Sequence, residues 1–233
     1  MLISETGVVL LLFFFFFIHV VVKRTVELIK HAEDFRKAHG IAPISYEVGT
    51  DLHTTFFDPE VARNLTAKVR PYGSYIKGHY SDDVENPEDY PKAGMGAANV
   101  GPEFTMNEYD ALAELEEEEK KLHAEGKIAQ LSNMTQVLWQ CVYDSNRWKK
   151  WLHGEEVGKD LKDCTPDRQL WLVKTGCRYI WQKPEALVAR QTLYDNLERL
   201  DIHAEEVVLM RIEHNMDKYY NAFNIVNLND YLK

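Results

Sequence analysis

The sequence predicts an α/β protein, with a short parallel sheet in the first half of the chain and a region made only of helices after it. Three apolar stretches with strand character, residues 44–48, 74–77 and 97–100, alternate with helical patterns and end in polar or glycine-rich loops. From Thr105 onward only helical periodicity is found. Strands that alternate with helices pair in parallel. We therefore expect half of a (β/α)8 barrel or a small doubly wound sheet, both of which bind ligands at the carboxyl ends of their strands.

The first helices follow from apolar spacing and from cap residues. Residues 25–39 carry apolar side chains at near-helical spacing and end before Gly40, which suits a helix C-cap. After the first strand, Asp58-Pro-Glu predicts a short helix that runs to about Lys68, with Pro59 in its first turn. An acidic, proline-bearing loop over residues 85–92 connects the second strand to the third.

The segment from Ala97 to Glu108 combines an apolar strand, a glycine-proline turn and the start of a helix. Thr105 and Glu108 stand at the positions of a capping box, and Phe104 and Tyr109 at those of a hydrophobic staple, so the pattern predicts a helix that begins at Met106. In α/β folds, helix N-termini next to strand ends hold anions, often sugar phosphates. An ordinary strand-to-helix connection is the alternative.

The helical region begins with a run of charges over residues 114–121. Its pairs Glu116–Lys120 and Glu117–Lys121 predict a solvated helix face. An apolar stripe over residues 134–142 follows, and after it comes an aromatic-basic segment over 147–152. Two further amphipathic helices are expected, over 184–200 and 208–219.

Residues 8–22 are almost wholly apolar and include five consecutive phenylalanines. The run is shorter than the roughly 20 residues of a spanning helix. No Lys or Arg precedes it and no small-x-small site follows it, which disfavours a cleavable signal. Three interpretations stay open: residues foreign to the fold, a single-pass membrane anchor, and a buried strand.

Composition and charge exclude some classes of function. The net charge of −10, without clustered Lys and Arg, argues against a nucleic-acid partner. Cys141, Cys164 and Cys177 form no CxxC pair, so neither a disulfide framework nor a zinc knuckle is indicated. We expect a cytoplasmic protein, unless residues 8–22 tether it to a membrane.

Four blocks in the same order resemble the D-tagatose-1,6-bisphosphate aldolase GatZ/KbaZ-like subunit family. These blocks are Ser45-Tyr-Glu-Val-Gly-Thr-Asp51, Lys77-Gly-His-Tyr-Ser-Asp82, Ala97-Ala-Asn-Val-Gly-Pro-Glu-Phe104 and Arg147-Trp-Lys-Lys-Trp151. The resemblance implies a TIM-like (β/α)8 barrel of which this chain holds only the C-terminal half. The expected domains are an apolar segment over 1–23, a partial α/β barrel over 24–126 and a helical region over 127–233 that packs on the barrel.

The resemblance also implies carbohydrate metabolism with ketose phosphates as substrates. Members are either non-catalytic partners of a zinc-dependent catalytic aldolase subunit or ketose-phosphate 4-epimerases. Two alternatives are a truncated, non-catalytic barrel fragment that acts through a partner chain, and a membrane-tethered α/β protein of unrelated function.

The candidate site residues lie at the predicted strand ends. Asp51, His79 and Glu103 are candidate ligands of a divalent metal such as zinc, with Asp82 beside them, and such an ion polarises a ketose carbonyl. His79 and Asp82 are the candidate catalytic residues, because an imidazole takes up a proton near neutral pH. For each of these residues the alternative is a loop residue that caps a turn or helix.

Phosphate or hydroxyl contacts are expected at the third strand end and at one arginine. Asn99 and Gly101 are candidates by their position after the strand. Arg178 lies in the block Cys177-Arg-Tyr-Ile-Trp181, which matches an Arg-Tyr-aromatic-Trp block of the family, and its guanidinium suits a phosphate. A salt-bridged surface arginine is the alternative.

Overall fold

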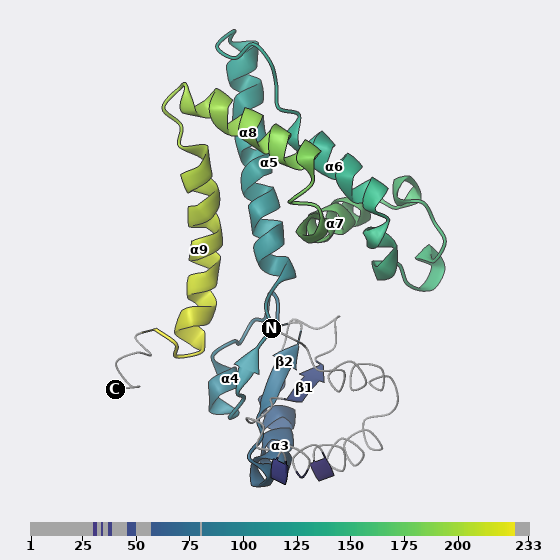
Figure 1. Ribbon diagram of the computed structural model, residues 1–233, viewed down its shortest axis with the longest axis vertical. Coiled ribbons are helices and arrows are strands. Elements are labelled where there is room, and N and C mark those ends of the chain that lie inside the picture. Colours follow the sequence, from purple (N-terminus) through teal and green to yellow (C-terminus); the bar gives the residue numbers. More distant parts are fainter. Residues whose placement is uncertain are drawn as a thin grey trace. The chain divides into compact units, whose positions relative to one another are not determined.

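A computed structural model describes residues 30–31, 34, 37–38, 46–49, 57–79 and 81–226. The chain divides into two units, Met1–Asn99 and Val100–Lys233 (Figure 1). This division differs from the boundary expected after residue 126, because helix α5 (Pro102–Ala124) shares a core with the helices that follow it. Of the helix expected over residues 25–39, the five described positions are helical. The apolar segment 1–23 lies outside the described residues.

The first unit contains a three-stranded parallel sheet in the order β1-β2-β3. The strands are β1 (Tyr46–Gly49), β2 (Ile76–His79) and β3 (Ala97–Ala98). Gly49 pairs with His79, and Gly78 pairs with Ala98, so the pairing is parallel as expected. β2 begins two residues later than predicted, because the left-handed Gly73 (φ 71°) closes the 3₁₀ helix η1 (Arg70–Tyr72) and the ladder starts only at Ile76.

Helix α3 (Pro59–Val69) covers the sheet and begins where its sequence predicts. The Asp58 carboxylate caps it by accepting hydrogen bonds from the backbone N–H of Glu60 and Val61, at 2.9 and 3.1 Å. Val69 of this helix packs on Ile76 of β2 in a small core. The proline-bearing loop before β3 forms a short helix, α4 (Asp89–Lys92).

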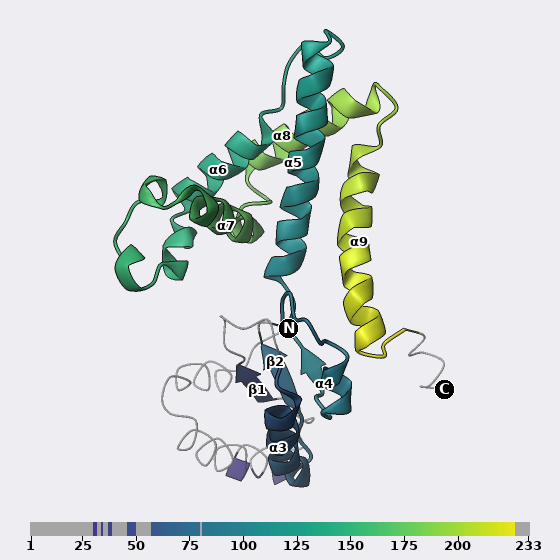
Figure 2. The ribbon, with the colours of Figure 1, turned by 180° about the vertical axis from the view of Figure 1, so that it is seen from behind.

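Helices alone make up the described part of the second unit. The α-helices are α5 (Pro102–Ala124), α6 (Met134–Ser145), α7 (Pro166–Gly176), α8 (Pro184–Glu198) and α9 (Ala204–Ala222). The 3₁₀ helices are η2 (Arg147–Trp151), η3 (Gly154–Glu156), η4 (Leu161–Asp163) and η5 (Cys177–Tyr179). Helix α9 runs back alongside α5 (Figures 1 and 2).

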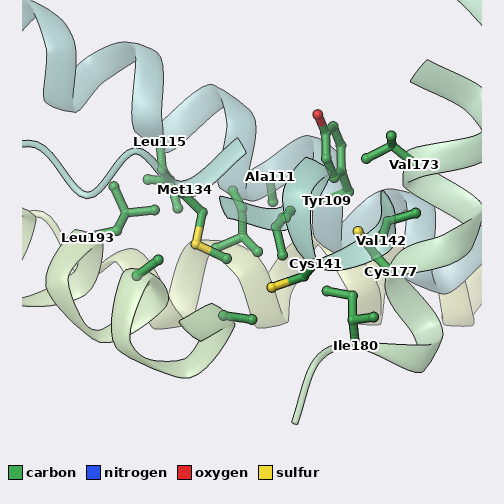
Figure 3. Close-up of a cluster of buried hydrophobic side chains, with 14 of the residues drawn as sticks. Tyr109, Ala111, Leu115, Met134, Cys141, Val142, Val173, Cys177, Ile180 and Leu193 are labelled. Carbon is green, nitrogen blue, oxygen red and sulfur yellow. The ribbon is translucent and has the colours of Figure 1, made fainter. Parts of the chain in front are cut away.

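One apolar core joins α5 to α6, α7 and α8 (Figure 3). Each of these helices contributes at least one fully buried leucine to the core, and η4 contributes another: Leu112, Leu138, Leu161, Leu172, Leu193 and Leu197. α6 and α7 approach closely at Gly176, where a Cβ atom would lie 2.6 Å from Cγ1 of Val142. All three cysteines are free thiols, and burial in this core raises the pKa of Cys177 far above its ordinary value.

The charge run of α5 is only partly a solvated face, which corrects the prediction. Lys120 does pair with Glu116, at 3.3 Å, but Glu116 and Glu119 are buried. Glu116 accepts hydrogen bonds from the backbone N–H and the hydroxyl of Thr135, and Glu119 accepts them from Ser132. The two carboxylates therefore hold the start of α6 and the loop before it against α5.

Within the part of the chain that the structure describes, no helix is both long and apolar enough to cross a membrane.

Candidate functional site

The carboxyl ends of β2 and β3 bring three predicted site residues together. His79 is the last residue of β2, Asp82 lies in the turn that follows, and Asn99 directly follows β3. The backbone N–H of Asn99 donates to the carbonyl of Gly78 at 2.9 Å, and the N–H of Ser81 donates to the carbonyl of Asn99 at 3.0 Å. The three residues thus share one edge of the sheet, where parallel strands place ligands. The side chains of His79 and Asp82 are half-buried.

The buried Tyr90 packs against the carboxyl end of β2 and holds the turn that follows it. The Tyr90 hydroxyl donates to Ser81 Oγ at 3.0 Å. Burial raises the pKa of Tyr90 and the nearby Asp82 carboxylate raises it further, so the phenol stays protonated while it holds Ser81. Gly78 leaves room for this ring, because a Cβ atom there would lie 2.5 Å from Tyr90 Cε1. The glycine of the Lys77–Asp82 block is therefore required by packing under the strand end.

The loop that carries Tyr90 is closed by one asparagine. Asn86 accepts a hydrogen bond from the N–H of Phe57 at 3.0 Å and donates to its carbonyl at 2.9 Å. The Phe57 ring stacks on Tyr90 with the ring centroids 4.0 Å apart. These contacts fix the ring that supports the strand end.

In the helical unit, Gly101 and Arg178 lie together. Helix α5 begins at Pro102 with Gly101 as its N-cap, four residues before the predicted start at Met106. The predicted capping box at Thr105 is therefore wrong: proline at the first position, with its fixed φ, starts the helix instead. A Cβ atom on Gly101 would lie 3.4 Å from Nη2 of Arg178, so the guanidinium rests against the first turn of α5.

Glu103 is buried between α5 and α9. Its carboxylate accepts a hydrogen bond from the Tyr219 hydroxyl and lies 3.6 Å from Nζ of Lys218. The Phe104 and Tyr219 rings also pack in a T-shaped arrangement, with their centroids 5.9 Å apart. The Glu103 side chain therefore holds the two helices together.

The segments around Arg178 carry three residues that the sequence did not single out as site residues. The ammonium group of Lys150 donates a hydrogen bond to the Tyr179 hydroxyl and lies 4.3 Å from the centre of its ring. Arg147 and Arg178 lie over the same ring, at 5.3 and 5.4 Å from its centre. The block 147–151 was visible as an aromatic-basic segment, but its meeting with Tyr179 depends on the tertiary fold.

A hollow of about 740 Å³ lies elsewhere in the helical unit, between α5, α6 and α7. Its lining includes four polar side chains from the start of α6 and the residue before it: Asn133, Thr135, Gln136 and Gln140. None of the predicted site residues borders the hollow.

A family model, D-tagatose-1,6-bisphosphate aldolase subunit GatZ/KbaZ-like, matches residues 52–223, well over half of the chain. The chain belongs to this family. No curated protein and no solved structure matches it. Three of the four blocks that carry the resemblance lie inside the matched range: Lys77–Asp82, Ala97–Phe104 and Arg147–Trp151. The GatZ/KbaZ-like match therefore includes the β2 and β3 strand ends and the Gly101 turn.

The metal site expected at Asp51, His79 and Glu103 stays a prediction for this GatZ/KbaZ-like chain. Asp51 lies outside the described residues, and Glu103 is engaged by Tyr219 and Lys218. Among the described residues no three His, Cys, Asp or Glu side chains are grouped to hold an ion. Glu103 therefore does not fit as a ligand, and we derive no step through a metal.

Proposed function

We propose that this GatZ/KbaZ-like chain handles ketose phosphates in carbohydrate metabolism, as a tagatose-bisphosphate aldolase subunit or as a ketose-phosphate 4-epimerase. The family match over residues 52–223 carries the proposal. Aldol cleavage and 4-epimerisation through a retro-aldol step share one chemical demand. A base removes a hydroxyl proton, and the carbon–carbon bond then breaks to leave an enediolate that must be stabilised.

The strand-end residues have the chemistry for the proton transfer. His79 is half-buried at the end of β2, and its imidazole is the proposed base. Asp82 is the neighbouring carboxylate, and in this proposal it orients the imidazole. The amide of Asn99 offers both a donor and an acceptor to sugar hydroxyls.

The Gly101 turn has the chemistry for a phosphate group. The first turn of the 23-residue helix α5 carries the positive end of the helix dipole. Arg178 adds a guanidinium against the same turn, and within the described part of the chain it has no carboxylate partner. These features support Gly101 and Arg178 as phosphate contacts. They disfavour the two alternatives, an ordinary strand-to-helix connection at Gly101 and a salt-bridged surface arginine at position 178.

We also propose that the sheet is part of a TIM-like barrel. Three parallel strands in sequential order, with helices in the connections, are the repeating pattern of that fold. A doubly wound sheet instead reverses its strand order at a switch point.

A non-catalytic role beside a separate aldolase chain is the second candidate function. The family's description as an aldolase subunit favours it. In this case the chain stabilises or activates the catalytic subunit, and the strand-end residues contribute no proton transfer.

The test is a turnover assay with the full chain, alone and mixed with a tagatose-bisphosphate aldolase catalytic subunit. Cleavage of tagatose 1,6-bisphosphate or epimerisation of a ketose 6-phosphate by the chain alone, lost in His79→Ala, supports the catalytic role. Stimulation of the catalytic subunit that persists in His79→Ala supports the non-catalytic role. The absence of both turnover and stimulation with all of these substrates refutes the proposed function.

A further inference from the structure

We propose that Arg147, Lys150 and Arg178, gathered around the Tyr179 phenol, form a binding site for a phosphate monoester. The binding site itself is argued from the structure. Only the identity of its natural ligand, a sugar phosphate, rests on the proposed function. The site lies in the helical unit, and its central residues, Lys150 and Tyr179, were not among the sequence-predicted site residues.

The local backbone explains why two of the cations converge. In a 3₁₀ helix, side chains three residues apart lie in line. Arg147 and Lys150 have this spacing in η2, and both reach the ring of Tyr179. Trp148 and Trp151 occupy the other positions of the same spacing, and Trp148 is fully buried. Trp148 thus anchors η2 in the core. Arg147 and Lys150 lie on the Tyr179 side together with Trp151, whose ring centre is 6.0 Å from that of Tyr179.

The third cation comes from the neighbouring segment. Arg178 precedes Tyr179 in η5, its guanidinium lies 5.4 Å from the ring centre, and it also contacts the Gly101 turn. Tyr179 is 39% exposed, so a ligand can reach the cluster from solvent.

The cluster is electrostatically unbalanced. Within the described residues no carboxylate pairs with Arg147, Lys150 or Arg178, although the chain as a whole carries a net charge of −10. Partial burial raises the pKa of Tyr179, but the hydrogen bond from Lys150 and the three positive charges outweigh this effect and lower it below its ordinary value. Three cations held close together repel one another, and an anion placed among them relieves that repulsion.

The compactness of the cluster favours a phosphate group over an acidic protein surface. All three cations lie within 5.4 Å of the centre of one ring. A phosphate monoester brings nearly two negative charges and three acceptor oxygens into a space of that size, whereas a protein carboxylate brings one charge. Two planar guanidinium groups and one ammonium group supply the matching donors.

The first test is a calorimetric titration of the full-length chain with inorganic phosphate at low ionic strength. We expect one site whose affinity falls about tenfold or more in Lys150→Gln and in Arg178→Gln, as loss of a charge-assisted contact predicts. Lys149→Gln is the matched control, because Lys149 belongs to the same 3₁₀ helix but lies over Trp148, 5.5 Å from its ring centre. Its affinity for phosphate should match that of the unsubstituted chain.

The second test uses Tyr179 as a reporter. The phenolate absorbance of the chain, minus that of Tyr179→Phe, isolates this side chain. Phosphate should raise the pKa that this difference reports, since the anion neutralises the neighbouring cations, whereas chloride at equal ionic strength should not. Fructose 6-phosphate in place of inorganic phosphate should bind at the same site and compete with it.

The proposal is overturned if phosphate binding is absent, or is equal in Lys150→Gln, Arg178→Gln and Lys149→Gln. Binding of a polyglutamate peptide to the cluster without any phosphate binding also overturns it, in favour of a docking surface for an acidic protein. Because these titrations need no aldolase, failure of the turnover assay leaves the site standing. Failure here removes Arg178 as a phosphate contact and leaves the turnover assay to decide the proposed function.

Discussion

Replacement of the buried Glu119 by alanine should destabilise the helical unit more than any surface substitution in the same helix. The Glu119 side chain is fully buried in α5 and accepts hydrogen bonds from Ser132 and Asn196. The donors are the Ser132 backbone N–H at 3.1 Å, its hydroxyl at 2.7 Å and the Asn196 amide at 2.6 Å. Glu119→Ala leaves buried donors without an acceptor.

The expected loss of unfolding free energy follows from these contacts. Each buried donor left unsatisfied costs about 1–3 kcal/mol, so the two donors of the buried Ser132 cost about 2–6 kcal/mol together. This loss is a large share of the unfolding free energy of a typical domain, which is roughly 5–15 kcal/mol. Urea unfolding followed by far-ultraviolet circular dichroism measures it.

The control for this measurement is Glu118→Ala, one residue earlier on the exposed side of α5. Glu118 pairs with Lys121 at 3.1 Å, and exposed pairs of this kind contribute about 0.5 kcal/mol or less. If Glu119→Ala costs no more than Glu118→Ala, the carboxylate does not hold the loop before α6 and the reasoning is refuted.

Three further predictions concern the strand end, pH and metal. Gly78→Ala should destabilise the first unit by about 1–3 kcal/mol, because the new methyl group overlaps the Tyr90 ring, and an unchanged urea midpoint would contradict this. The hydrogen bond to Glu198 raises the pKa of His203, so its stabilising contribution is present below the ordinary pKa and is lost as pH rises through the raised one. Urea midpoints of the chain and of His203→Gln should therefore converge at high pH, and a constant difference would exclude this linkage. Chelation should abolish any turnover by the chain, and zinc should restore it, if His79 and Asp82 contribute to a metal site; turnover that survives chelation rules the metal out.

The parts of the fold that depend on local signals could be predicted from the sequence. Asp58 and Pro59 start α3 as expected, since a cap carboxylate and a proline act on their own neighbours. Parallel pairing followed from the alternation of strands and helices, and β2 and β3 do place His79, Asp82 and Asn99 at one edge.

Two errors came from local patterns that the tertiary structure overrides. Thr105 and Glu108 have the spacing of a capping box, but Pro102 starts α5 one turn earlier, and Glu108 instead pairs with Arg190 of α8 at 3.4 Å. The charges of residues 114–121 suggested a solvated face. Glu116 and Glu119 are buried because Thr135 at the start of α6 and Ser132 in the loop before it donate hydrogen bonds to them. The charges along α5 alone do not reveal these donors.

The cluster of Arg147, Lys150 and Arg178 around Tyr179 could not be predicted from the sequence. Read as an α-helix, the segment 147–151 would place Arg147 and Lys150 about 60° apart around the axis. As a 3₁₀ helix it aligns Arg147 with Lys150. The partner ring, Tyr179, lies 29 residues further along the chain from Lys150, so no local pattern links the two. What joins them is the burial of Trp148 and of Cys177 in one core, which holds η2 and η5 side by side. A substitution that loosens this core should therefore separate the cations from Tyr179 and weaken phosphate binding even though it touches none of them.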